Sequence, residues 1–259
     1  MAVGLAVHTA DGKLQINENY FNMFLVEKKL LTLVNAAPPN ATQSTYFTYN
    51  AIVPLSQYPN CVFAVRHELD SNIGIPLGTR VFEGNLYIDA YAKINGLQVY
   101  LYVFSYDKTR PVVIDGSNYG MRIRDAQNNV IFDSRAKYLK ILHAVRQNFG
   151  SEIANNNSEE RNLYTANISG LTGRTLAYFI PAGSFVDYLY TWTEEETYRG
   201  FDRVGLASCM YITNGALKVD YKRFRYYIYI TRTSSGALPP DFWYASYTLC
   251  AFLIDVTNY

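Results

Sequence analysis

The 259-residue sequence has few of the residues from which disulfide frameworks are built. Only three cysteines occur, and Cys61, Cys209 and Cys250 lie far apart in the chain, each among apolar neighbours. An odd number of scattered cysteines indicates buried free thiols in a reducing compartment. No segment approaches the roughly 18 apolar residues that a membrane-spanning helix needs. We therefore expect no disulfide bonds and no membrane insertion.

The sequence also lacks the local signatures of catalysis and of cofactor binding. It contains no Gly-x-Ser-x-Gly elbow, His-Glu-x-x-His pair, P-loop or Gly-x-Gly-x-x-Gly fingerprint. Its three histidines, His8, His67 and His143, have no second ligand at the spacing of a zinc site. These absences predict a protein that is not an enzyme and that has no cofactor and no metal.

Neither sign of charge dominates. Lys and Arg together number 23 and Asp and Glu 22, which leaves a net charge of +1. Such a chain has no long-range field to attract nucleic acid or an anionic membrane, so we expect no nucleic-acid partner. The N-terminus has no basic segment followed by an apolar run. This predicts that no signal peptide is present and that the chain stays in the cytoplasm where it is made.

Aromatic residues are abundant, with 24 Tyr and 14 Phe. They favour pleated, half-buried surfaces and are enriched where one protein meets another. Helix patterns are scarce, whereas runs of alternating or continuous apolar residues bounded by polar turns recur along the chain. The sequence therefore predicts an all-β protein, with strands at residues 44–53, 61–67, 81–94, 97–104, 176–180, 224–231 and 247–255.

Two segments have the form of a β-hairpin. In residues 4–17 an Asp-Gly pair supplies the turn, so Val7 is expected to face Ile16 and Thr9 to face Leu14. In residues 120–133 a Gln-Asn pair lies at the corresponding tip, and Ile123 is expected to face Phe132.

The two hairpins superimpose at a shift of 116 residues, which suggests an internal duplication. Residues 84–89 also resemble residues 215–220, at a shift of 131, and a longer loop at residues 150–160 would explain the change of shift. A chance resemblance between two hairpins of a β-rich chain is the alternative. The duplication predicts two tandem β-sandwich-like domains, residues 1–112 and residues 113–259, of which the second has the longer loops.

Two aromatic segments are candidate contact sites. Trp192 and Tyr198 flank three consecutive glutamates, an arrangement that suits a carbohydrate site, a sugar-binding platform or a plain acidic loop. Glycoside hydrolysis needs two carboxylates about 5 to 10 Å apart, which adjacent residues do not obviously provide. Phe242, Trp243 and Tyr244 follow a Pro-Pro pair and suit either an anchor for a partner subunit or a plug between sheets.

Residues 119–134 read YGMRIRDAQNNVIFDS. This segment resembles a module of small tail proteins of long-tailed, siphovirus-type bacteriophages, whose members follow the pattern YGLxVxDxxGxxxFDS. Residues 4–17 resemble the same module, but Ile16, Asn17 and Glu18 stand where Phe-Asp-Ser is expected. The resemblance implies a structural protein of the tail tip or baseplate without catalytic residues. It also implies β-sandwich domains around a central hub, commonly in threefold symmetry.

Together these observations predict a non-enzymatic virion structural protein of the phage tail, made in the bacterial host cytoplasm. It would assemble around the tail hub as a symmetric homo-oligomer such as a trimer, contact hub, tail tube or fibre proteins, and support tail fibres. A receptor-binding protein of the same tail tip, with aromatic loops that contact the host surface, is the alternative. A glycan depolymerase is less favoured; it would use carboxylates among Glu194, Glu195, Glu196 and Asp202.

Overall fold

The structure of the protein is a computed structural model. It describes residues 7–8, 14–16, 23–35, 47–67, 77–92, 96–107, 109–114, 116, 119–125, 127–148, 161–182, 185–194, 198–213, 216–231, 242–246 and 248–259. Some strand residues, including those between 181 and 209 and between 221 and 247, are described by their backbone alone.

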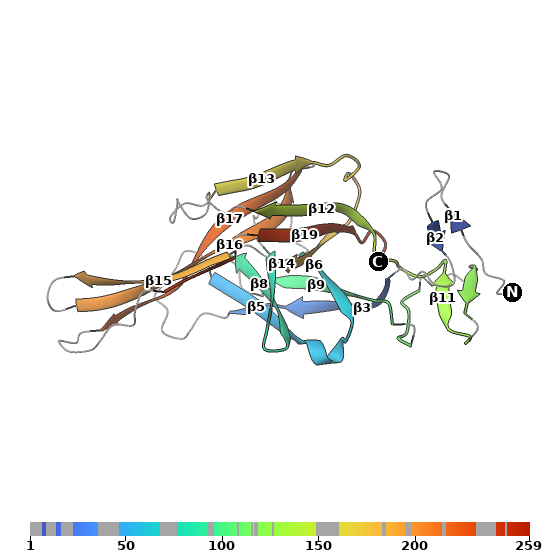
Figure 1. Ribbon diagram of the computed structural model, residues 1–259, viewed down its shortest axis with the longest axis horizontal. Coiled ribbons are helices and arrows are strands. Elements are labelled where there is room, and N and C mark those ends of the chain that lie inside the picture. Colours follow the sequence, from blue (N-terminus) through green and yellow to red (C-terminus); the bar gives the residue numbers. More distant parts are fainter. Residues whose placement is uncertain are drawn as a thin grey trace.

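The described residues form antiparallel strands arranged in two large sheets and two hairpins, with one short 3-10 turn, η1 (Leu55–Gln57) (Figure 1). The expectation of an all-β protein is confirmed. The six-stranded sheet has the order β12 (Ile141–Asn148), β19 (Thr248–Asp255), β14 (Leu176–Ala182), β6 (Cys61–His67), β9 (Gln98–Ser105), β3 (Phe24–Thr32).

The second sheet has nine strands. Along its main path lie β13 (Arg161–Asn167), β17 (Ala216–Thr231), β16 (Tyr198–Thr213), β7 (Leu77–Phe82), β8 (Asn85–Ala92), β5 (Phe47–Pro54) and β4 (Val34–Asn35). Off this path β15 (Phe185–Glu194) pairs with β16, and β18 (Phe242–Ser246) pairs with β15. The hairpins are β1 (Val7–His8) with β2 (Leu14–Ile16), and β10 (Arg122–Arg124) with β11 (Val130–Asp133).

The core lies between the two large sheets and consists of two apolar clusters. One is built from the first half of the chain and includes Ile88 and Leu101, which are both fully buried. The other is built from the second half and includes Leu217 and Leu253, which are also fully buried. Removal of this apolar surface from water is the main term that holds the sheets together.

A third cluster covers the outer face of the six-stranded sheet. Tyr102 and Phe104 of β9 are fully buried there, beneath Leu139 and Tyr259. The segment that follows β9 is fixed to β3 by backbone hydrogen bonds, for example from Leu25 N to the carbonyl of Lys137 at 2.7 Å. Burial on both faces explains why β9 is a nearly continuous apolar run.

The two halves of the chain occupy matching positions in both sheets. In the six-stranded sheet β3, β9 and β6 of the first half correspond to β12, β19 and β14 of the second half. In the larger sheet β5, β8 and β7 correspond to β13, β17 and β16. The halves join where Val65 pairs with Tyr178 and where Leu77 pairs with Met210. Strands from both sides of residues 112 and 113 thus share both sheets, and the domain division at this point stays a prediction.

The second half contains an arm that the first half lacks in the described residues. β15, β18 and the adjoining parts of β16 and β17 run out past the sandwich, at the end opposite the two hairpins (Figure 1). The strands that begin at Cys61 and Leu176 occupy matching positions 115 residues apart, whereas those that begin at Asn85 and Ala216 lie 131 apart. The additional residues therefore follow β14.

This offset corrects the expected position of the insertion. A longer loop at residues 150–160, which themselves lie outside the described residues, would raise the offset before β14 and not after it. The prediction was wrong because a polar, turn-prone segment indicates a loop but not its length relative to another loop. The additional residues include strand-forming aromatic segments such as β15.

The hairpin registers were predicted with one error. Val7 pairs with Ile16 and Ile123 with Phe132, as expected. Leu14, however, pairs with His8 and not with Thr9, because the register shifts after Val7. The apolar run at residues 81–94 is likewise not one strand, since residues 83 and 84 form a turn between β7 and β8 with φ angles of 47° and 73°.

Candidate functional site

The segment that resembles the phage tail module forms the β10–β11 hairpin, and Asp125 fixes its turn. The Asp125 Oδ1 accepts hydrogen bonds from the backbone N–H groups of Gln127 (3.0 Å) and Asn129 (2.8 Å). Asn128 has a φ of 67°, in the left-handed region that asparagine tolerates better than most residues. The Asp-x-Gln-Asn-Asn sequence thus closes the hairpin through its own side chains.

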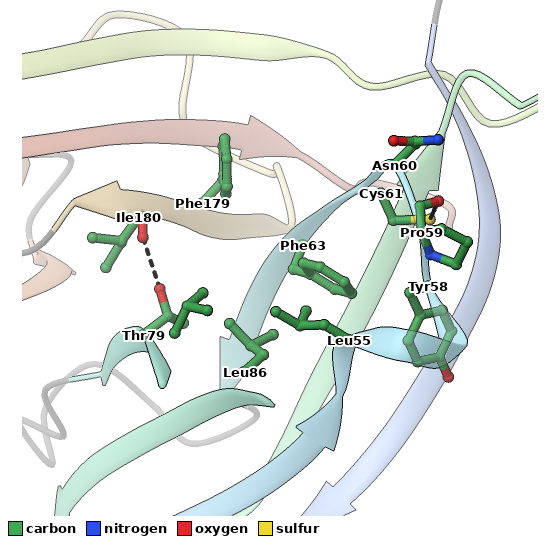
Figure 2. Close-up of a pocket in the computed structure, with 11 residues that line it drawn as sticks. Leu55, Tyr58, Pro59, Asn60, Cys61, Phe63, Thr79, Leu86, Phe179 and Ile180 are labelled. Carbon is green, nitrogen blue, oxygen red and sulfur yellow. Dashed lines mark hydrogen bonds between the residues drawn. The ribbon is translucent and has the colours of Figure 1, made fainter. Parts of the chain in front are cut away.

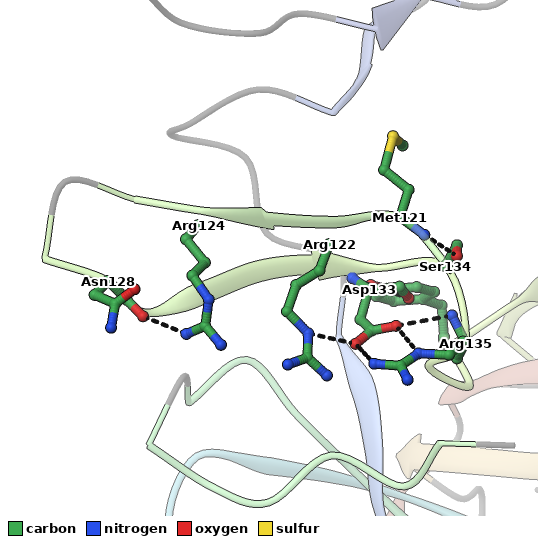
Figure 3. Close-up of polar contacts among 8 residues, drawn as sticks. Met121, Arg122, Arg124, Asn128, Asp133, Ser134 and Arg135 are labelled. Carbon is green, nitrogen blue, oxygen red and sulfur yellow. Dashed lines mark hydrogen bonds and ion pairs between the residues drawn. The ribbon is translucent and has the colours of Figure 1, made fainter. Parts of the chain in front are cut away.

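Asp133, the aspartate of the Phe-Asp-Ser sequence, lies at the centre of a charged network (Figure 3). Its side chain is almost fully buried, and its Oδ1 and Oδ2 accept hydrogen bonds from Arg135 Nε at 2.8 Å and Nη2 at 2.7 Å. Arg122, directly opposite in the ladder, donates from Nε to Oδ2 at 2.8 Å. The bonds from Arg135 and Arg122 hold the pKa of the Asp133 carboxyl well below its ordinary value, although burial acts in the other direction.

Three further residues of this segment, Gly120, Phe132 and Ser134, also have structural contacts. The Ser134 Oγ accepts a hydrogen bond from the backbone N–H of Met121 at 2.9 Å. A Cβ at Gly120 would lie 2.8 Å from Arg135 Cγ and 2.9 Å from the Ser134 Oγ, so the close packing requires glycine. Phe132 stacks on Tyr138, with ring centroids 5.6 Å apart. These contacts hold the hairpin and the residues that follow it in place.

Exposed apolar side chains lie beside this hairpin. Tyr119 is 89% exposed, Met121 51% and Ile114 42%. The basic side chains of Arg122 and Arg124 are also partly exposed, and they project from the hairpin on the side away from Met121 (Figure 3). Tyr, Met and Arg are residue types that are enriched where proteins contact one another.

A cavity of about 420 Å³ opens between the two sheets near their junction. Leu55, Phe63, Leu86 and Ile180 supply most of its wall (Figure 2). Thr79, on the opposite strand, donates a hydrogen bond from Oγ1 to the carbonyl of Ile180 at 2.9 Å and so connects the two halves of the chain.

The described residues that line this cavity are mostly apolar. No Asp, Glu or His is among the residues that line it. The Cys61 thiol is partly exposed and contacts the carbonyl of Pro59 at 3.5 Å. Tyr58 donates to Glu27 at 2.7 Å, and burial together with that bond raises the pKa of Tyr58 to about 12. The tyrosine therefore stays neutral near pH 7 and is not a base.

All five aromatic residues that the sequence singled out lie in the arm. Trp192 pairs with Gly200, and Tyr198 pairs with Glu194, in the β15–β16 ladder. Phe242, Trp243 and Tyr244 belong to β18 and pair with Leu189, Tyr188 and Asp187 of β15. The fold thus brings two segments that are 50 residues apart in sequence into one sheet.

Alternation along the strands places these positions on two faces of the arm. Trp192 is an even-numbered position of β15, and Tyr198 and Trp243 pair with the even-numbered positions Glu194 and Tyr188. These three positions therefore fall on one face of the arm. Phe242 and Tyr244 fall on the other face. Both faces of the arm therefore have aromatic positions.

The acidic positions of the arm do not have the spacing that glycoside hydrolysis needs. In the β15–β16 ladder Asp202 pairs with Tyr190, four residues along β15 from Glu194. At roughly 3.4 Å per residue these positions are about 14 Å apart along the strand, which exceeds the 5 to 10 Å that a pair of catalytic carboxylates needs. Glu195 and Glu196 lie outside the described residues.

The described residues provide no metal centre, since no three His, Cys, Asp or Glu side chains gather there. Tyr164 and His143 contact one another across 3.5 Å. Cys61 and Cys250 are free thiols. Both are partly exposed, whereas the sequence predicted buried thiols. In the described part of the chain no helix is long and apolar enough to cross a bilayer.

Sequence reasoning missed the Asp133 network, although its signal was present. The predicted pairing of Ile123 with Phe132 places Arg122 opposite Asp133, and opposite charges directly across a ladder attract. Comparisons with protein-family models, with curated proteins and with solved structures found no match to this chain.

Proposed function

We propose that the chain is a non-enzymatic structural protein of a bacteriophage virion, located at the tail tip or baseplate, where symmetric copies assemble around the tail hub. The observation that carries the proposal is the segment at residues 119–134. It resembles the phage tail module, and its residues Gly120, Asp133 and Ser134 have structural contacts at the hairpin. A module of this kind suits assembly rather than catalysis.

The arrangement of the molecule supports the same proposal. The hairpins lie at one end, the aromatic arm at the other, and the two-sheet body separates them (Figure 1). A component that bridges neighbours in a large assembly needs contact surfaces at more than one end. The exposed apolar and basic residues beside β10–β11 suit a hub, tail tube or fibre protein, and the arm offers a second surface.

We further propose that the two halves arose by internal duplication of a β-sandwich-like unit. Matching strand orders in both sheets support it, as does the hairpin that precedes each half. On this account residues 1–112 and residues 113–259 are the two units, and the arm is an elaboration of the second.

A receptor-binding protein of the same tail tip is the second candidate, and the arm is the observation that favours it. Trp192, Tyr198 and Trp243 fall on one face of a projecting sheet. Aromatic residues at such positions could contact surface glycans of the host. A glycan depolymerase has less support, because the Glu194 and Asp202 positions are widely separated.

The phenotype of a phage that lacks this chain distinguishes the three candidate functions. The structural proposal predicts that purified particles contain the chain and that its loss blocks tail assembly, as electron microscopy of the lysate would reveal. Complete tails that fail to adsorb would favour receptor binding. Host glycan hydrolysis that is abolished in Glu194→Gln or Asp202→Asn would favour the enzyme, and complete absence of the chain from the particle would refute a virion role.

A further inference from the structure

Among the described residues, the arm has two strand edges that lack a neighbouring strand. β13 pairs with β17 only between Ala216 and Tyr221, so residues 222–231 have a ladder partner, β16, on one side alone in the described chain. β5 approaches β17 but forms no ladder with it. On the other side of the arm, β18 pairs with β15 and with no further described strand. Edge strands of this kind present backbone N–H and C=O groups to a neighbouring chain.

The directions of the strands make these two edges complementary. The arm has the order β18-β15-β16-β17, and every pairing in it is antiparallel. Because four alternating strands lie side by side, the two edge strands run in opposite directions. If a second copy is rotated about an axis roughly parallel to the strands, its β18 meets β17 of the first copy in the antiparallel sense.

The charges of the two edges are also complementary. The outer part of β17 has Lys222, Arg223 and Arg225 and no acidic residue. On the other side, β15 has Asp187 and Glu194 and no basic residue, and β18 has no charged residue. The basic β17 edge is therefore attracted toward the side of the arm that has the acidic residues of β15, whereas two basic edges placed side by side repel.

We propose that copies of this chain join through their arms, with residues 222–231 of β17 in one copy paired antiparallel to β18 of the next. Such a contact is heterologous, and it closes into a ring when the rotation between copies closes. The inference rests on the proposed function for its partner, a second copy in a symmetric assembly, and it assigns the surface that joins the copies.

Disulfide trapping between copies tests the contact. In the full-length chain the native cysteines are first replaced by alanine, and circular dichroism checks that the strands persist. One preparation then has Ala245→Cys in β18, and the others have Phe224→Cys, Tyr226→Cys or Ile228→Cys in β17. We expect a covalent dimer on oxidation of a mixture of the two kinds and none from any preparation alone. Dimers from the β17 variants alone, or no mixed dimer with any partner, would overturn the proposal.

Charge reversal gives a second test that needs no cysteine. Arg223→Glu with Arg225→Glu is expected to abolish the oligomer in light scattering, and high salt is expected to weaken the wild-type oligomer. The matched control is Lys29→Glu with Arg146→Glu, which makes the same change at exposed positions on the edge strands β3 and β12 of the other sheet. An equal loss in the control, or no loss in the β17 variant, would refute the proposed edge contact.

The two proposals can fail separately. If the chain is found in the particle but yields no mixed disulfide, the arm contact is refuted and the structural role stands. If mixed disulfides form but the chain is absent from the particle, the arm contact stands and the virion role is refuted.

Discussion

Replacement of Asp133 by asparagine tests whether the motif aspartate is structural. The carboxylate is almost fully buried and accepts hydrogen bonds from the guanidinium groups of Arg135 and Arg122. An amide of the same shape retains one acceptor oxygen but loses the negative charge. Hydrogen bonds to charged groups contribute about 1.5 to 3 kcal/mol each. Arg122 is partly exposed and regains water when its partner is lost, which lowers the cost.

We therefore expect Asp133→Asn to destabilise the β10–β11 hairpin by about 2 kcal/mol. Since 1.4 kcal/mol corresponds to a factor of ten, local opening should become about 30 times more frequent. Hydrogen exchange read by mass spectrometry on peptides from residues 119–138 measures this directly. The Ser134 N–H, bonded to the Met121 carbonyl at 2.9 Å, should be among the amides that lose protection.

Asp107→Asn is the matched control. The Asp107 Oδ1 accepts from the Thr109 N–H (3.0 Å) and hydroxyl (2.7 Å), but its side chain is 35% exposed and its ion pair with Arg110 spans 3.9 Å. An amide oxygen can accept the same hydrogen bonds, so we expect Asp107→Asn to cause little change in hydrogen exchange. If Asp133→Asn leaves exchange of residues 119–138 unaltered, or behaves as the control does, the carboxylate does not hold the hairpin and the structural interpretation is wrong.

Three further predictions concern the stability of the protein. Gly120→Ala should lower the thermal midpoint, because the new Cβ would press on Arg135 and Ser134 at a cost of about 1 to 3 kcal/mol. In the control Gly116→Ala the new Cβ meets nothing within 4 Å, so this change should be neutral. Equal effects of the two changes would contradict the prediction. Leu101→Ala and Leu253→Ala, at fully buried positions in the two clusters, should each cost about 3 kcal/mol. Calorimetry should show a single transition for both, because the halves share both sheets; two transitions would indicate independent domains. Finally, the lowered pKa of Asp133 makes its contribution to stability complete above about pH 4, the ordinary range of an aspartate, and lost as the pH falls toward its folded value. Acid titration of unfolding should therefore show a smaller loss below pH 4 for Asp133→Asn than for the wild type, and an identical loss would contradict this.

Much of the local structure followed from the sequence because strand formation and turns depend on nearby residues. The strand Cys61–His67 was predicted with its observed bounds, since its apolar run is bounded by turn-forming residues. The register at Ile123 and Phe132 followed from the length of the turn between them. The shift after Val7 was missed because a bulge changes the pairing by one residue without a clear local signal.

The arm could not be predicted from the sequence. β15 and β18 read as aromatic segments that suit either an interface or an interior plug, and period-two patterns do not identify the partner of a strand. Their pairing places Trp243 opposite Tyr188 through a contact between distant parts of the chain. Non-local pairing of this kind depends on the whole fold, which is also why the additional residues were assigned to the polar loop at residues 150–160.

Reconstruction of the intact phage tail by electron cryomicroscopy tests the central claim most directly. The structural proposal predicts a ring of symmetric copies packed around the tail hub, with the β10–β11 hairpin against a neighbouring tail protein and the arms in contact with one another. Isolated copies with free arms at the distal tip would favour receptor binding instead. A complete tail in which this chain has no density would contradict the proposed function.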